Sequence, residues 1–254
     1  GGEKRQRPQL HGESLHARTR AGAAGIPRMV VMMTEQMALW FQLPMRHRLR
    51  WFAVWLLAAL AVLAMANPVA AKPAQILVVG DSLSAGYGLS AGEGWVDLLT
   101  KKLAREKFAA QVTNASISGD TTAGGLARLP ALLAKHKPTL VVIELGGNDG
   151  LRGSPVAAAR ANLLKMAELA KAAGARVLVV GMRMPPNFGP TYTAQFEAMY
   201  ADVAKAVGGG LVPFFLDRIG TDLSKFQADR IHPTAAAQPE LLDTVWPALV
   251  KLLK

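Results

Sequence analysis

From Lys72 to the C-terminus, short runs of apolar, often β-branched residues alternate with longer stretches in which apolar positions recur every three or four residues. The short runs contain few polar residues, which is typical of strands buried on both faces of a parallel sheet. The longer stretches have the spacing of amphipathic helices. The pattern predicts strands at 75–80, 111–114, 139–145, 175–181 and 211–215, and helices at 95–106, 121–136, 155–173, 191–207 and 234–252.

This alternation predicts an α/β domain over residues 72–254, built as a three-layer α/β/α sandwich on a five-stranded parallel sheet. Pro247 lies inside the last predicted helix, and we expect it to kink or divide that helix because it lacks an N–H donor. In such sheets ligands bind where the strands end, so the loops at their carboxyl ends are the expected place for function.

Residues 46–71 have the layout of a secretory signal peptide. Arg46, Arg48 and Arg50 form a positive patch, and residues 51–66 follow without a charge and end in small side chains. Because this run is short for a bilayer span, which takes roughly 20 apolar residues, we expect export with cleavage of the signal peptide. The alternative is an uncleaved segment that anchors the protein to the inner membrane.

Residues 1–45 carry glycine, arginine and polar residues without apolar periodicity, and Met45 directly precedes the positive patch. Signal peptides lie at the N-terminus of a chain. We therefore interpret Met45 as the start of the natural protein and residues 1–45 as a disordered or wrongly assigned extension.

The net charge of +11 needs to be divided along the chain before it indicates a partner. Residues up to Ala71 carry 9 Lys and Arg against 3 Asp and Glu, a net +6 that leaves +5 for residues 72–254. There the basic side chains are scattered and not interleaved with aromatic ones, so we expect no nucleic-acid partner. The chain has no cysteine, which excludes disulfides, a thiol nucleophile and thiolate metal ligands.

Polar, glycine-rich loops follow the first three predicted strands. Asp81 and Ser82 follow the first, residues 116–122 the second and residues 146–149 the third. Carboxyl ends of parallel strands meet at one edge of a sheet, so we expect these loops to form one site. Asp81 and Asp149 are expected to hold their loops through local hydrogen bonds.

Ser82 needs a base to become a nucleophile, because a free hydroxyl reacts weakly at neutral pH. The predicted domain has two histidines, and His136 lies between lysines in the last turn of a helix, where an imidazole is usually a capping or surface group. His232 is therefore the predicted base, and Asp229, three residues earlier, is predicted to orient it. The alternative for Asp229 is a turn cap. Ser84 lacks the glycine spacing of a nucleophile elbow, so we expect a loop hydrogen bond from it.

A carbonyl attacked by serine develops a negative oxygen that requires hydrogen-bond donors. The candidates are the backbone N–H groups of Ser82 and Gly119 and the side-chain amide of Asn148; the alternative for residues 146–149 is an ordinary tight turn. Residues 151–153 and 182–192 either line an acyl pocket at the same edge or pack as loops. The candidate pocket residues are Leu151, Met184, Pro185 and Phe188.

Four segments, in this order, resemble the sequence blocks of the SGNH (GDSL) hydrolases, and residues 76–253 resemble exported bacterial esterases of that family. The segments are Gly80-Asp81-Ser82-Leu83-Ser84, residues 114–121, residues 146–149, and Asp229 to Pro233. The resemblance implies a flavodoxin-like fold, a periplasmic location, and hydrolysis of aryl and acyl esters, acyl thioesters and lysophospholipids. It implies a catalytic triad of Ser82, Asp229 and His232, with Ser82, Gly119 and Asn148 as the oxyanion hole.

Arg230 departs from the family, which usually has glycine between the aspartate and the Ile-His pair. We expect the arginine either to alter the loop geometry or to lower the pKa of Asp229.

Two other functions remain as alternatives. A metal-dependent phosphoesterase gathers several His and carboxylate ligands, whereas the predicted domain has only two histidines. A non-catalytic envelope binding module would bind a ligand without turning it over. We expect no metal or cofactor, a small-molecule ester, thioester or lysophospholipid as the substrate, transient membrane contact through the signal peptide, and a monomer.

Overall fold

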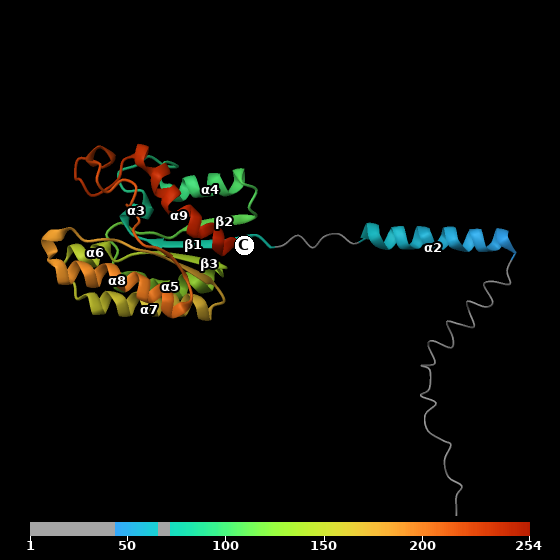
Figure 1. Ribbon diagram of the computed structural model, residues 1–254, viewed down its shortest axis with the longest axis horizontal. Coiled ribbons are helices and arrows are strands. Elements are labelled where there is room, and N and C mark those ends of the chain that lie inside the picture. The colour runs from blue at the N-terminus through green and yellow to red at the C-terminus, as the bar shows by residue number, and fades with distance from the viewer. Residues whose placement is uncertain (1–43, 66–71) are drawn as a thin grey trace, which may run out of the picture. The chain divides into compact units, whose positions relative to one another are not determined.

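The computed structural model describes residues 44–65 and 72–254. Contacts separate the chain into two compact units, Gly1–Val69 and Ala70–Lys254. The sheet and all of the helices that cover it belong to the second unit (Figure 1).

In the first unit, helix α2 (Met45–Met65) contains the positive patch and most of the apolar run of the predicted signal peptide. The interpretations of residues 1–43 and 66–71, which include the cleavage region, lie outside the described residues. Among the helices that the structure describes, none has the length and apolar character needed to cross a membrane.

The second unit contains five parallel strands: β1 (Ala74–Gly80), β2 (Ala110–Asn114), β3 (Leu140–Glu144), β4 (Arg176–Val180) and β5 (Gly210–Val212). Their order in the sheet is β2-β1-β3-β4-β5, which confirms the predicted five-stranded parallel sheet. β2 pairs with one edge of β1 and β3 pairs with the other edge, so the strand order reverses direction at β1. Ligands of open α/β sheets bind at such a switch point, beyond the carboxyl ends of the strands.

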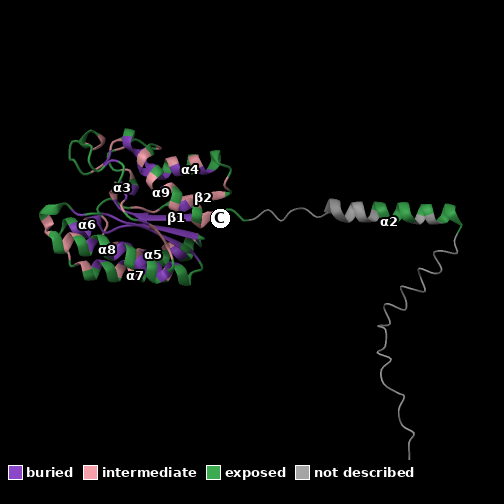
Figure 2. Ribbon diagram, viewed as in Figure 1, coloured by how far each residue is buried: buried purple, intermediate pink, exposed green. Residues whose placement is uncertain are grey.

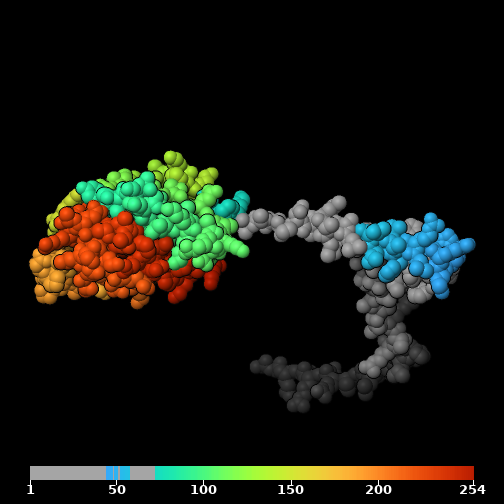
Figure 3. All heavy atoms as spheres, turned by 90° about the horizontal axis from the view of Figure 1, so that it is seen from above, coloured from blue at the N-terminus to red at the C-terminus, as the bar shows by residue number. Residues whose placement is uncertain are grey.

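Helices cover both faces of the sheet and complete three layers. They are α4 (Trp95–Arg105), α5 (Thr122–His136), α7 (Val156–Ala172), α8 (Pro190–Val207) and α9 (Gln238–Leu253). α4 and α9 pack against each other on one face, whereas α5, α7 and α8 cover the other (Figure 1). In the view from above, the red C-terminal segment lies beside the green segment that contains α4 (Figure 3).

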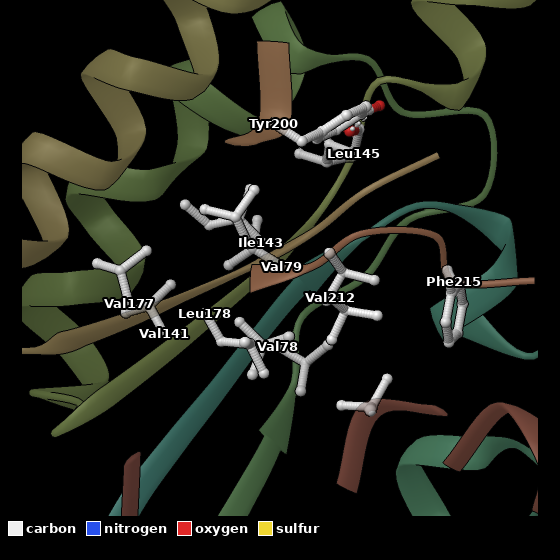
Figure 4. Packing of buried hydrophobic residues seen from close by; sticks show 14 of the residues in the cluster. Val78, Val79, Val141, Ile143, Leu145, Val177, Leu178, Tyr200, Val212 and Phe215 are labelled. Atoms are coloured by element: carbon white, nitrogen blue, oxygen red, sulfur yellow. Dashed lines mark hydrogen bonds between the residues drawn. The ribbon is translucent and has the colours of Figure 1, made fainter. Parts of the chain in front are cut away.

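The central strands β1, β3 and β4 are largely buried, as their apolar composition predicts, whereas β2 and β5 at the edges of the sheet are mostly only partly buried (Figure 2). Every residue of β3 is buried, including the glutamate that ends it. Figure 4 shows Val79 and Ile143 of the sheet in the packed interior, with Tyr200 of α8 beside Leu145. Burial of one aliphatic side chain contributes roughly 1.5–3 kcal/mol relative to exposure, so the sheet is a firm base for the loops at its carboxyl edge.

β5 is shorter than the strand predicted at 211–215, because Pro213 has no N–H to donate to a neighbouring strand. The chain nevertheless stays hydrogen-bonded to Gly181, which follows β4, on both sides of the proline. Gly181 N–H donates to the Val212 carbonyl, and Phe215 N–H donates to the Gly181 carbonyl, each at 2.8 Å. Phe215 is apolar because its ring is fully buried, edge-on to Trp95, and not because it extends the strand.

The last predicted helix, 234–252, has two parts: Ala235–Ala237 form a 3₁₀ turn, and α9 begins at Gln238. Pro247 does not divide α9, which continues to Leu253. The apolar face of α9 is buried on both sides of the proline, through Val245 and Leu249, and this packing holds the helix together.

Candidate functional site

Ser82 begins a short helix, α3 (Ser82–Ala85), directly after β1. Asp81 caps this helix, because its Oδ1 accepts the backbone N–H two residues ahead at 3.0 Å. Gly80 permits close packing behind the serine, since a β-carbon there would lie 2.8 Å from Oε2 of Glu144. The sequence pattern did not predict α3, because four residues are too few to show helical periodicity.

Ser82, His232 and Asp229 form a hydrogen-bonded chain. His232 Nε2 lies 2.9 Å from Ser82 Oγ, and His232 Nδ1 lies 2.7 Å from Asp229 Oδ2. The other carboxylate oxygen of Asp229 accepts the backbone N–H groups of Ile231 and His232, at 2.9 and 3.0 Å. Asp229 therefore both caps its own turn and holds the imidazole, so the two roles considered for it, turn cap and partner of the histidine, occur together.

The side-chain hydrogen bond with His232, followed by the backbone N–H groups of His232 and Ile231, lowers the pKa of Asp229 to about 2. Such a carboxylate stabilises the fold above the ordinary aspartate pKa of 3.8 and loses this contribution as the pH falls toward 2. Arg230 is not among the groups that lower this pKa, so that effect, expected as one alternative, does not occur.

Arg230 instead affects the loop through its own backbone conformation. Its φ of 58° lies in the left-handed region, where glycine has no steric cost and other residues do. The residue also lines the cavity described below. This position, where the resemblance to the SGNH hydrolases implies a glycine, thus has the backbone conformation that glycine favours although an arginine occupies it.

Arg230→Gly is expected to raise the free energy of unfolding by up to about 1 kcal/mol. Relief of the left-handed strain, about 1–2 kcal/mol, outweighs the backbone entropy of an added glycine, about 0.5–1 kcal/mol. Urea unfolding followed by circular dichroism measures the change. Arg230→Ala is the control, because it removes the guanidinium but keeps the β-carbon; an equal gain in both variants would show that the side chain, not the backbone, is responsible.

Asn148 joins the loops that follow the first three strands. It lies on α6 (Gly147–Leu151), and its Nδ2 donates to Asp81 Oδ2 at 3.1 Å and to the Asp120 carbonyl at 2.9 Å. Topology predicted that these loops meet. Both amide hydrogens are used within the protein, so Asn148 reaches a substrate oxygen only by sharing or releasing one of them.

Unlike the amide of Asn148, the two backbone N–H groups predicted to bind the oxyanion have no hydrogen-bond acceptor in the described structure. The N–H groups of Ser82 and Gly119 donate to no acceptor among the residues that the structure describes. Gly119 has a φ of 79°, and a β-carbon built on it would meet nothing within 4 Å. Both groups are therefore available to a ligand.

Three further residues were considered in the sequence. Asp149 does not hold its own loop through local hydrogen bonds, as predicted, but holds the start of α5, 27 residues away, by accepting the backbone N–H and the hydroxyl of Thr122 at 2.9 and 2.6 Å. Ser84 is buried and donates to Oε2 of Glu144 at 2.7 Å, the kind of loop hydrogen bond expected of it. His136 ends α5.

A cavity of about 390 Å³ opens beside Ser82 and His232. Of the four predicted pocket residues, Leu151, Met184 and Pro185 line it. Phe188 does not line it, because its ring stacks on Tyr192 with centroids 5.9 Å apart. The volume is in the range of small-molecule sites, about 300–1,000 Å³.

Sequence reasoning missed the part of this wall that follows β5: Phe214, Leu216, Phe226 and Ile231. The signal was available, because this loop also leaves the carboxyl end of a strand. It missed Tyr87 as well, whose ring centroid lies 4.4 Å from that of His232. Within 44–65 and 72–254, no three His, Asp or Glu side chains are grouped so as to hold a metal ion.

Comparison with known proteins gives the family of this chain. Residues 78–238 match the model of the GDSL-like lipase/acylhydrolase family. Esterase TesA of Pseudomonas aeruginosa is 54% identical over 201 residues, which cover 79% of this chain and 99% of that protein. Thioesterase 1/protease 1/lysophospholipase L1 of Escherichia coli K12 is 44% identical over 174 residues, 68% of this chain and 82% of that protein. A crystal structure of TesA superposes with a TM-score of 0.69 at 57% identity, covering 70% of this chain and 99% of that one.

The chain belongs to the GDSL-like lipase/acylhydrolase family, since the family model spans more than half of it and a relative with 54% identity is matched over nearly its whole length. It is an enzyme, a carboxylic ester hydrolase of the SGNH type.

Proposed function

We propose that this protein is a serine esterase in which Ser82 is the nucleophile, His232 the general base and acid, and Asp229 the residue that orients the base. The observation that carries the proposal is the hydrogen-bonded chain with distances of 2.9 and 2.7 Å. Nε2 faces the serine hydroxyl while Nδ1 is held by an ionised carboxylate, which fixes the tautomer that accepts the serine proton.

The reaction proceeds through an acyl-enzyme. Ser82 Oγ attacks the carbonyl carbon as its proton passes to His232 Nε2, and the carbonyl oxygen becomes an oxyanion. The free N–H groups of Ser82 and Gly119 stabilise the oxyanion, together with Asn148 once it redirects one amide hydrogen. His232 then protonates the leaving alcohol or thiol, and a water molecule, deprotonated by His232, releases the acid in the same way.

The substrates we propose are acyl esters, acyl thioesters and lysophospholipids. Side chains such as Met184, Phe214 and Leu216 give the cavity apolar walls suited to an acyl chain. The names of the relatives, esterase and thioesterase/lysophospholipase, agree with this class.

We also propose that α2 forms part of a signal peptide and that residues 72–254 act in the periplasm. Edman sequencing of the enzyme isolated from a periplasmic extract tests this. An N-terminus close to Lys72 is the expected result, whereas an intact α2 on membrane-bound enzyme would favour the anchor.

The function is tested by assaying the protein with p-nitrophenyl esters and acyl-CoAs of increasing chain length. We expect turnover of both classes, with kcat/KM rising while added methylene groups enter the cavity and levelling once it is filled. Each buried methylene contributes about 0.8 kcal/mol, or roughly fourfold in kcat/KM. A folded protein that binds these compounds without hydrolysing them would be the binding module instead.

A further inference from the structure

Glu144, the last residue of β3, is a fully buried carboxyl group behind the serine loop. Its Oε2 accepts the hydroxyl of Ser84 at 2.7 Å and the backbone N–H of Asp81 at 3.4 Å. Both donors flank Ser82, one on each side in the sequence. None of the chemical steps above uses this glutamate.

The hydroxyl of Ser84 has a second partner in Trp95. The indole N–H of Trp95 donates to Ser84 Oγ at 3.2 Å, and an indole can only donate. Ser84 Oγ accepts this hydrogen and gives its own to Oε2 of Glu144 at 2.7 Å. The other oxygen, Oε1, has no hydrogen-bond partner among the described residues.

The surroundings of Glu144 favour its neutral form. Burial and the neighbouring carboxylate of Asp81 raise the pKa of Glu144 well above its ordinary value of 4.5. Burial also raises the pKa of Asp81, to about 6, but that group keeps hydrogen bonds from Leu83 N–H and Asn148 and faces His232. The other ionisable group that faces Glu144 is the buried phenol of Tyr200, which supplies no positive charge. A charged carboxylate with an unpaired oxygen in this place would be very costly.

The same network reaches the histidine loop. Trp95 donates its backbone N–H to Oε1 of the buried Gln238 at 3.0 Å. Nε2 of Gln238 contacts the carbonyls of Pro233 and Thr234, at 3.5 and 3.4 Å. Pro233 directly follows His232, so hydrogen bonds connect Glu144 with the loops that carry both the nucleophile and the base.

We propose that Glu144 is a positioning residue, a neutral carboxylic acid that holds the serine loop, and through Ser84 and Trp95 the histidine loop, in reactive register. This inference rests on the proposed roles of Ser82 and His232. A glutamine in this place keeps the acceptor oxygen and the neutral charge, whereas a methionine keeps the bulk and loses the acceptor.

The first test compares Glu144→Gln with Glu144→Met. We expect Glu144→Gln to keep most of the wild-type kcat for a short p-nitrophenyl ester, and its pH profile to be unchanged on the acid side. Glu144→Met is expected to lose about 10²-fold in kcat with little change in KM, because a displaced nucleophile loses its alignment and not its binding site. Ser84→Ala removes the same hydrogen bond by a smaller change and should lower kcat in the same direction if the methionine variant does not fold.

Loss of kcat in Glu144→Gln as large as in Glu144→Met would overturn the proposal. So would a shift of the acid limb of the Glu144→Gln profile to lower pH. Removal of a nearby negative charge would make His232 easier to deprotonate, which would mean that Glu144 was ionised.

The second test is independent of activity. A carboxyl group whose pKa is raised on folding stabilises the protein below its ordinary pKa and loses this contribution as the pH rises. The stability of Glu144→Gln relative to wild type should therefore increase with pH above about 4.5. Glu106→Gln, which removes an exposed carboxylate at the end of α4, should show no such rise.

A difference between Glu144→Gln and wild type that stays flat with pH would refute the neutral glutamate whatever the enzyme hydrolyses. A wild-type protein that hydrolyses no ester would instead refute the proposed function, so the two failures are distinguishable.

Discussion

Ser82→Ala should lower kcat for a p-nitrophenyl ester by roughly 10⁶-fold while leaving KM and the unfolding transition close to those of the unmodified protein. In the proposed mechanism the hydroxyl oxygen of Ser82 becomes acylated, and alanine removes it without disturbing the buried strand behind it. His232→Ala should cost about as much, because an unactivated serine is nearly as ineffective as none. The double variant should be no slower than either single one, since the residues act as one unit.

Ser90→Ala is the matched control, as it makes the same chemical change between α3 and α4 and away from the cavity. Full activity in Ser90→Ala and none in Ser82→Ala would assign the loss to one hydroxyl. Substantial turnover by folded Ser82→Ala would mean that another group attacks the ester, and the assignment of the nucleophile would be abandoned.

Asp229→Asn should lower kcat by about 10⁴-fold at pH 7. The asparagine has nearly the same shape, but if its one oxygen accepts the backbone N–H groups, its NH₂ group faces Nδ1 and cannot accept the Nδ1 hydrogen. The neutral amide also does not balance the imidazolium that forms during attack. The imidazole is then free to turn to the tautomer that cannot accept the serine proton. Steady-state rates on the same ester measure the loss, and KM should change little because Asp229 does not line the cavity.

Asp222→Asn supplies the control from the same loop. The carboxylate of Asp222 caps a turn by accepting the N–H and hydroxyl of Ser224 at Oδ1, a task that an asparagine oxygen can also perform. We expect nearly full activity. If the two asparagine variants lost the same activity, Asp229 would be a structural cap and not the partner of the base.

The fold could be predicted because most of its strands, though not β2, are runs of apolar residues. Runs such as 139–145 have one explanation in a chain of this size, a strand covered on both faces, and the structure has β3 there. The strand predicted at 211–215 is too long, because some of its apolar residues are buried without belonging to a strand. Phe214 and Phe215 are apolar because they line the cavity and the core, and Pro213 had already ended β5.

The site could be predicted in part because its chemistry depends on few residue types. The position of Ser82 after the first strand and the elimination of His136 in favour of His232 predict the pair, and the two side chains lie 2.9 Å apart. Glu144 could not be found in this way, since a glutamate at the end of a strand suggests an exposed edge, and only the packing reveals that it is buried. Pocket walls such as Phe226 depend on how a long irregular loop folds back, which no periodic pattern encodes.

The hydrogen bond between Ser82 and His232 joins positions 150 residues apart, at the first strand and in the last loop. A contact of such long sequence separation forms late in folding, because the chain between the two residues must already be ordered. A polypeptide emerging from the ribosome would carry its nucleophile early and would lack the base until its last segment had been made and docked. The recovery of turnover during refolding would therefore report when the last loop docks, and the incomplete chain would hydrolyse no ester before that step.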